Sequence, residues 1–278
     1  METRTFLICI HYNNLKIKKS VNKFSKKIGL SESDIIIVDT SESLKLQSGV
    51  IDGRDVNRFF EFSGYQYGLL KLKEMYERTE FEDEIINVIF INDTIFSSHI
   101  TELFIRVCSK AISTYSHNRV TGLTLHKWHG AIIPTCCFVL SSTTKAILST
   151  KLLPEDFFKS DKLVDLKDKD IESLYVDNRH RFTNAVKSWL LPKSFFSGWY
   201  KASPWNPIPV ADYRRKYLAI FLEHSMVRVL SIQGYSLAES NTDPVIKVMS
   251  FFDRVNNNLL KLRYRTLSFF KYKMNSNE

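Results

Sequence analysis

The sequence predicts an α/β fold: a mostly parallel sheet flanked by helices, with a helical C-terminal region. A continuous apolar run at 6–12 and largely apolar runs at 85–92 and within 34–43 are typical of central strands covered on both faces. Apolar residues recur at helical spacing in the segments between these runs. Strands and helices therefore alternate along the chain, which favours parallel strands joined by crossover helices.

The first half of the chain supplies three strand–helix steps. After the strand at 6–12, four apolar residues recur at helical spacing and Gly29 follows as a stop signal: Ile17, Val21, Phe24 and Ile28. The second strand lies within 34–43, a helix is expected over 65–77, and the third strand is 85–92. Ligands bind beyond the carboxyl ends of the strands in such sheets.

The second half is less regular. An amphipathic helix is expected at 98–113, strands at 119–126 and 132–141, a short helix at 143–148, and a long helix at 213–233 that stops at Gly234. Segments 153–180 and 197–213 predict loops, short helices and irregular connections. We expect a sheet-containing core over 1–180 and a helical region over 181–278, together forming one continuous domain.

The composition fits a globular protein with a substantial core. The 278 residues are 44% hydrophobic and 25% charged, and no apolar run approaches the ~20 residues that a membrane span needs. The first residues lack a small-residue cleavage site and are interpreted as a strand, not a signal peptide. The net charge of +9 predicts an anionic partner, namely nucleotide phosphate, nucleic acid or a lipid surface.

The four cysteines predict free thiols in a reducing cytoplasm. Cys9, Cys108, Cys136 and Cys137 show no spacing typical of a zinc site. Neighbouring residues of a strand point to opposite faces, so the adjacent pair is a poor disulfide candidate.

Polar residues follow each of the first three strands. The clusters are His11 to Asn14, Asp39 to Ser41, and Asn92 to Thr94. Parallel strands end at the same edge of a sheet, so the three clusters predict one ligand site. An Asx-type turn at Asn92 to Thr94 and a helix cap or turn at Asp39 are the structural alternatives.

Several common catalytic motifs are absent. The sequence contains no GxGxxG, no GxxxxGK[ST], no GxSxG and no HExxH. Their absence weighs against a dinucleotide dehydrogenase and a P-loop NTPase. His126 and His129 have a spacing that suits a metal on a helix, but their surroundings predict a turn between strands.

The segments "ICIHYNN", "IIIVDTSES", "FEFSGYQYGLLKLKE" and "VIFINDTIF" occur in an informative order. That order resembles the nucleotide-diphospho-sugar half of GT-A-type glycosyltransferases. In that family the first strand ends near a Tyr-Asn pair, the second in Asp followed by Ser, and a glycine-containing segment opens a helix. The next strand then carries an acidic, DxD-like motif. The resemblance implies a GT-A-like, Rossmann-like core.

A narrower resemblance rests on "FINDTIF", "GLTL", "IIPTCCFVLSSTTKAIL" and "YLAIFLEHSMVRVLSIQGYS". These segments are similar to rhamnan-synthesis-type (rhamnan synthesis protein F-like) bacterial glycosyltransferases, over roughly residues 5–240. The sequence departs from that pattern twice. His129 lies further before its strand than the family histidine, and Cys136 and Cys137 replace commoner aromatic residues.

The resemblance implies a donor site along the three strand ends. Tyr12 and Asn13 would lie beside the base, Asp39 and Ser41 would meet the nucleoside, and Arg58 would face the diphosphate. Gly64, Asn92 and Thr94 complete the expected nucleotide-sugar contacts. Asp93 would meet the diphosphate directly or through a divalent cation, Mn²⁺ or Mg²⁺, because such cations prefer oxygen ligands.

Further roles carried over by the resemblance lie on the acceptor side. Glu223 matches the position of the family glutamate and is the candidate base for the acceptor hydroxyl. Thr124, His129 and His224 are the other acceptor-side candidates. A solvated Arg58 and a solvated or ion-paired Glu223 are the structural alternatives.

The C-terminal segment, about 256–273, mixes basic and apolar residues. Six apolar residues alternate with five basic ones: Leu259, Leu260, Leu262, Leu267, Phe269 and Phe270, with Lys261, Arg263, Arg265, Lys271 and Lys273. A basic amphipathic helix binds anionic lipid surfaces, so we expect a peripheral location on the inner face of the cytoplasmic membrane. A helix packed on the domain is the alternative.

The expected function is transfer of a sugar from a nucleotide-diphosphate donor to a glycan, in particular a lipid-linked glycan. The resemblance places this activity in bacterial surface-polysaccharide assembly, such as O-antigen, capsule or rhamnan synthesis. An inactive scaffold of the same fold and a nucleic-acid-binding protein are the alternatives. Basic residues are spread along the chain and no RNA-binding motif occurs, so nucleic acid is not an expected partner.

Overall fold

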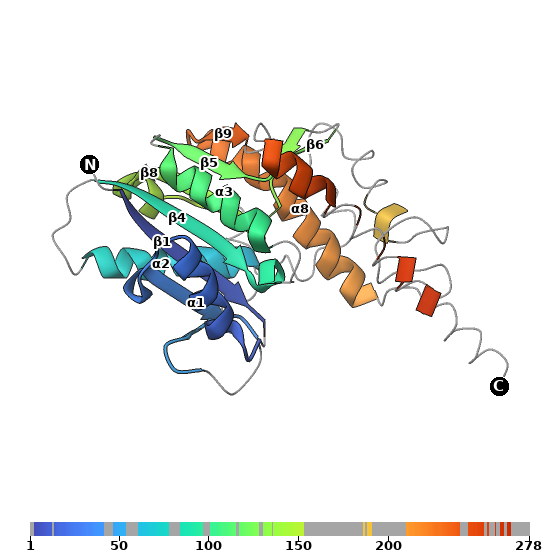
Figure 1. Ribbon diagram of the computed structural model, residues 1–278, viewed down its shortest axis with the longest axis horizontal. Coiled ribbons are helices and arrows are strands. Elements are labelled where there is room, and N and C mark those ends of the chain that lie inside the picture. The colour runs from blue at the N-terminus through green and yellow to red at the C-terminus, as the bar shows by residue number, and fades with distance from the viewer. Residues whose placement is uncertain are drawn as a thin grey trace. The chain divides into compact units, whose positions relative to one another are not determined.

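The computed structural model of the protein is shown in Figure 1. It describes residues 3–12, 14–41, 47–53, 61–77, 84–96, 101–114, 117–127, 130–134, 136–152, 186, 188–190, 210–239, 244–252, 255, 259, 262–263 and 266–267. Asn13, Arg58, His129 and most of the segments 153–180 and 197–213 lie outside these residues, as do many positions of 256–273.

A seven-stranded mixed sheet has the order β3-β2-β1-β4-β8-β5-β9. Its strands are β1 (Arg4–His11), β2 (Ile35–Asp39), β3 (Ile51–Asp52), β4 (Ile85–Asn92), β5 (Arg119–Gly122), β8 (Cys137–Thr143) and β9 (Ser236–Glu239). Within this sheet β8 alone is antiparallel to its neighbours. The expected α/β fold with a mostly parallel sheet is confirmed. A separate hairpin pairs β6 (Leu125–Lys127) with β7 (Gly130–Ile132).

The helices for which the structure gives bounds lie near the expected positions, with shifted ends. They are α1 (Ile17–Lys27), α2 (Glu61–Glu77), α3 (Thr101–Ser113), α4 (Thr144–Leu148) and α8 (Val210–Ile232), with short 3-10 turns η1 (Glu32–Asp34) and η3 (Asp93–Phe96). Gly29 and Gly234 follow α1 and α8 with φ of 75° and 88°, as stop signals require.

Three boundaries differ from expectation. Helix α2 already includes Glu61, ahead of the expected start near Tyr65. The short turn η3 follows β4, and α3 is described from Thr101. The strand expected over 119–126 divides, since β5 ends at Gly122 and Leu125 starts the hairpin.

Helices α2 and α3 cover opposite faces of the sheet (Figure 1). The Phe138 ring of β8 contacts the Tyr65 ring of α2 edge-on at 5.6 Å. Its neighbour Cys137 points the other way, with its Sγ 3.6 Å from that of Cys108 on α3. Cys9, Cys108 and Cys137 are buried free thiols and Cys136 is a half-buried one, so the expectation of free thiols is confirmed.

A buried polar row on the α3 face helps to set the strand register. Thr5, Asn87 and Ser141 are register partners across β1, β4 and β8. The Asn87 amide donates to Thr5 Oγ1 at 3.4 Å, and the Ser141 hydroxyl donates to Asn87 Oδ1 at 2.6 Å. A slip of one residue would bury these groups without partners.

Two glycines bring α2 close to β1. A Cβ added to Gly64 would lie 2.8 Å from Ile10 Cγ2, and one added to Gly68 would lie 2.4 Å from Ile8 Cγ2. Real Cβ atoms do not approach other carbons so closely, so glycine is required for this packing. Helix α2 therefore lies directly over the strand that carries His11 at its end.

The chain divides into two compact units. The first comprises Met1–Lys159 with Leu222–Lys247 and contains the sheet; the second comprises Ser160–Phe221 with Val248–Glu278. None of the described helices combines the length and hydrophobicity that crossing a bilayer demands.

Candidate functional site

The candidate site lies at the carboxyl ends of β1, β2 and β4. Strand β1 is flanked by β2 on one side and by β4 on the other. The strand order therefore reverses at β1, because β2 and β3 lie on one side of it and β4 on the other. The register aligns His11 with Asp39 and Ile10 with Asn92. Ligands bind at such reversal points in open α/β sheets. The three polar clusters therefore lie side by side.

His11 and Asp39 form a buried pair at the centre of this edge. The imidazole Nε2 lies 3.9 Å from Asp39 Oδ2, and both side chains are almost fully buried. His11 Nδ1 accepts a hydrogen bond from the Asn14 backbone N–H at 3.2 Å. In the neutral ring the proton therefore resides on Nε2 and faces Asp39.

Burial lowers the pKa of His11, and the negative charges of Asp39 and Asp93 oppose that shift without cancelling it. The imidazole is therefore favoured in its neutral form. Asp39 Oδ1 accepts a hydrogen bond from the Ser41 backbone N–H at 2.8 Å, which shapes the turn after β2. The turn that formed the structural alternative for Asp39 is thus present.

Asp93 is the half-buried carboxylate of the edge. Its Oδ2 lies 3.5 Å from the Tyr12 backbone nitrogen, a long hydrogen bond that joins the ends of β4 and β1. Burial raises the pKa of Asp93, and the negative charge of Glu61 at the start of α2 adds to the shift. Hydrogen bonds from backbone N–H groups and the proximity of His11 only partly oppose it. The carboxylate is thus poorly compensated.

Asn92 forms the turn that interrupts the strand. Its Oδ1 accepts a hydrogen bond from the Thr94 backbone N–H at 3.1 Å, an Asx turn that starts η3. The turn uses the amide of Asn92 and not the carboxylate of Asp93. Local turn formation therefore explains why residue 92 is polar and leaves the charge of residue 93 unexplained.

The donor set limits how a divalent cation would bind. The described residues contain no group of three His, Cys, Asp or Glu side chains that could hold a metal. Mg²⁺ needs only one or two carboxylates when substrate phosphates and waters supply the other oxygens. Asp93 fits that requirement, because a cation would compensate its half-buried charge.

The remaining predicted residues are distributed as follows. Tyr12 is 49% exposed beside Asp93, Ser41 is buried next to Asp39, and Thr94 is exposed. Thr124 is buried just beyond the carboxyl end of β5, at the same edge of the sheet. Gly64 lies within α2 against Ile10.

Glu223 and His224 are half-buried on α8. The hydrogen bonds and ion pairs given above for His11, Asp39 and Asp93 connect strand ends and do not involve α8. Asn13, Arg58 and His129 lie outside the described residues.

Two residues that shape the electrostatics of the site were not predicted from the sequence. His11 appeared only as part of a polar cluster, although it lies between Asp39 and Asp93 and feels both charges. A histidine that ends an otherwise apolar strand run was the available signal. Glu61 gave no signal, because its influence on Asp93 depends on where α2 begins.

The fold and site define an α/β protein with a polar cluster at a strand reversal point. Comparison with protein-family models, with curated proteins and with solved structures finds no match.

Proposed function

We propose that the protein is a glycosyltransferase that moves a sugar from a nucleotide-diphosphate donor to a glycan acceptor. The observation that carries this proposal is the half-buried, poorly compensated Asp93 at the reversal point between β1 and β4. A carboxylate retained there without a cationic side-chain partner among the described residues suits a ligand that brings its own cation. A nucleotide diphosphate with a divalent cation has that chemistry.

The strand ends suggest how the donor lies. The exposed ring of Tyr12 offers a surface on which a base can stack, next to the Asp93 carboxylate. Asp39 Oδ2 accepts no hydrogen bond among the described residues, so this atom is the one left for a ribose hydroxyl. His11, favoured in its neutral form, ties Asn14 to the end of β1 by accepting its backbone N–H.

Transfer requires that the leaving diphosphate be neutralised and the acceptor hydroxyl lose its proton. A bound divalent cation would supply the neutralising charge. Asp93 would orient the diphosphate, with Arg58 as a second contact. Glu223 is the proposed base, and Thr124, His129 and His224 are proposed contacts of the acceptor.

The proposed acceptor is a lipid-linked glycan of bacterial surface-polysaccharide assembly, which would require access to a membrane surface. Exposed apolar side chains lie in the C-terminal segment at Leu259, Leu262 and Leu267, and just before it at Phe251, Phe252 and Val255. Exposed apolar and basic residues together favour an anionic lipid surface. We propose that this segment binds the inner face of the cytoplasmic membrane.

A thermal-shift panel of nucleotide-sugars, with and without Mn²⁺, tests the donor proposal. A ligand present at ~100 times its Kd adds ~2.7 kcal/mol to the free energy of unfolding, which is readily detected. We expect one nucleotide family to stabilise the protein, more strongly with Mn²⁺. Asp93→Asn should remove the Mn²⁺-dependent part. Asp52→Asn, which removes a carboxylate from β3 at the same edge, should not.

Three other outcomes of these tests would indicate a different function. Donor binding without sugar transfer to any acceptor would identify an inactive scaffold. Stabilisation by single-stranded RNA, lost on adding salt, would favour the nucleic-acid-binding alternative. If no nucleotide stabilises the protein, the glycosyltransferase proposal is wrong.

A further inference from the structure

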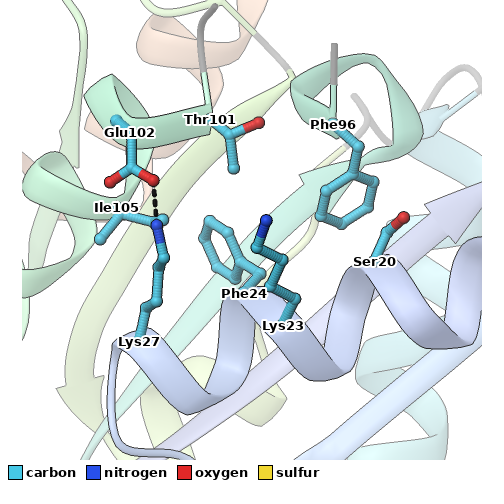
Figure 2. A pocket seen from close by; sticks show the side chains of 8 residues that line it. All are labelled: Ser20, Lys23, Phe24, Lys27, Phe96, Thr101, Glu102 and Ile105. Atoms are coloured by element: carbon cyan, nitrogen blue, oxygen red, sulfur yellow. Dashed lines mark hydrogen bonds and ion pairs between the residues drawn. The ribbon is translucent and has the colours of Figure 1, made fainter. Parts of the chain in front are cut away.

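A groove of about 300 Å³ lies on the sheet face opposite α2, between α1 and α3 (Figure 2). Its lining comes from α1, from the end of η3 and from the start of α3: Ser20, Lys23, Phe24, Lys27, Phe96, Thr101, Glu102 and Ile105. The volume is within the range of small-molecule sites. It belongs to the first unit and is separate from the strand-end site.

The apolar wall of the groove is formed by aromatic rings. Phe24 and Phe96 meet edge-on, with ring centroids 6.2 Å apart and planes at 82°. In the view of Figure 2 the Lys23 amino group lies beside the two rings, with Thr101 nearby. Ile105 extends the apolar surface from α3. The groove thus combines an apolar wall with one centrally placed cation.

Lys23 is the cation that the groove leaves uncompensated. Lys27, at the other end, forms an ion pair with Glu102. Lys23 has no hydrogen bond or ion pair with any of the described residues, and its side chain points into the groove (Figure 2). Helix α1 carries five lysines and no acidic residue, so its surface attracts anions.

We propose that this groove binds an organic phosphate. The phosphate would contact the Lys23 amino group and accept a hydrogen bond from the Ser20 hydroxyl, because lysine binds phosphate as a point charge. The apolar part of the ligand would pack mainly on the half-buried Phe96 ring, because Phe24 and Ile105 are buried. Glu102 is engaged by Lys27, which limits its repulsion of the anion. A lipid headgroup and a free metabolite present the same phosphate chemistry, and the probes below distinguish them.

Isothermal titration calorimetry with three probes tests this inference. The probes are dihexanoyl phosphatidic acid, phenyl phosphate and inorganic phosphate. We expect both organic phosphates to bind more tightly than inorganic phosphate, which lacks an apolar part. Tighter binding of the phosphatidic acid would assign the groove to a lipid headgroup, and tighter binding of phenyl phosphate would assign it to a free organic phosphate.

Lys23→Gln should weaken organic phosphate binding about tenfold. Lys26→Gln is the matched control, because it removes the same charge from the same helix outside the groove lining. Both side chains are exposed, so both variants should fold. Equal weakening by the two variants would mean that only the field of α1 attracts the ligand. That result, or no binding of either organic phosphate, would overturn the proposal.

Discussion

At the scale of single residues, Asp93 carries a charge that the fold disfavours. Burial and Glu61 raise the pKa of Asp93 in the folded chain. A carboxyl with a raised folded-state pKa contributes stability below its unfolded pKa and loses that contribution as the pH rises through the folded value. At neutral pH the charge of Asp93 therefore lowers the free energy of unfolding. A residue kept despite such a cost is a candidate for ligand binding.

This argument predicts the behaviour of Asp93→Asn without ligand. The variant keeps the side-chain shape and should have a higher Tm than the wild type at pH 7. The difference should shrink as the pH falls through the range in which Asp93 becomes protonated, because both side chains are then neutral. Thermal unfolding of both proteins between pH 4 and pH 8 measures this difference in Tm. A lower Tm of the variant at pH 7 would show that the carboxylate stabilises the turn.

The titration of His11 affects stability in the opposite direction. Burial lowers its pKa, so its contribution to stability is present above its unfolded pKa and is lost as the pH falls through the folded value. The negative charge of Asp93 raises the pKa of His11, so Asp93→Asn lets the pKa of His11 fall further. The variant should therefore lose more of the His11 contribution as the pH falls, which also narrows the Tm difference at low pH.

At the scale of secondary-structure elements, the close packing of α2 on β1 depends on glycine. Gly68→Ala improves helix propensity by about 0.5–1 kcal/mol. Its Cβ, however, would lie 2.4 Å from Ile8 Cγ2, and overpacking typically costs about 1–3 kcal/mol. We expect a net loss of roughly 1 kcal/mol in urea unfolding. Lys73→Ala, on the exposed face of α2, should stay within about 0.5 kcal/mol of wild type. A more stable Gly68→Ala protein would contradict the close contact.

The exposed C-terminal apolar residues are the second element with a testable role. Replacing Phe251, Phe252 and Leu259 with serine removes apolar surface that would enter the lipid interface. We expect binding to anionic liposomes in a sedimentation assay to fall at least about tenfold, with nucleotide-induced stabilisation unchanged. Leu70→Ser is the control, because Leu70 is similarly exposed on α2. If the wild-type protein does not bind anionic liposomes at low salt, the membrane proposal is wrong.

At the scale of the whole molecule, the sequence predicted the centre of the sheet better than its edges. Strands β1 and β4 are buried on both faces, and this burial shows directly as long, largely apolar runs. Strands β3 and β9 were not predicted. They have two and four residues, and their extended conformation depends on pairing with β2 and β5, not on local pattern.

The same distinction applies to the candidate site. Polar residues at strand ends could be predicted to share an edge, because parallel topology alone places them there. The pairing of His11 with Asp39 could not, because it depends on the register between β1 and β2. The influence of Glu61 on Asp93 depends on how α2 packs, which its glycines decide. Side-chain pairs across elements therefore require the structure.

The pairing of β5 with β9 has a consequence for protein synthesis. The Ser236 hydroxyl of β9 bonds to the Asn118 carbonyl, 118 residues earlier in the chain. At about 5–20 residues per second, a ribosome needs on the order of ten seconds to deliver β9 after β5 has emerged. During that interval the outer edge of β5 has no permanent partner and can pair with other nascent strands. The four-residue length of β5 and the charge of Arg119 at its start limit this risk.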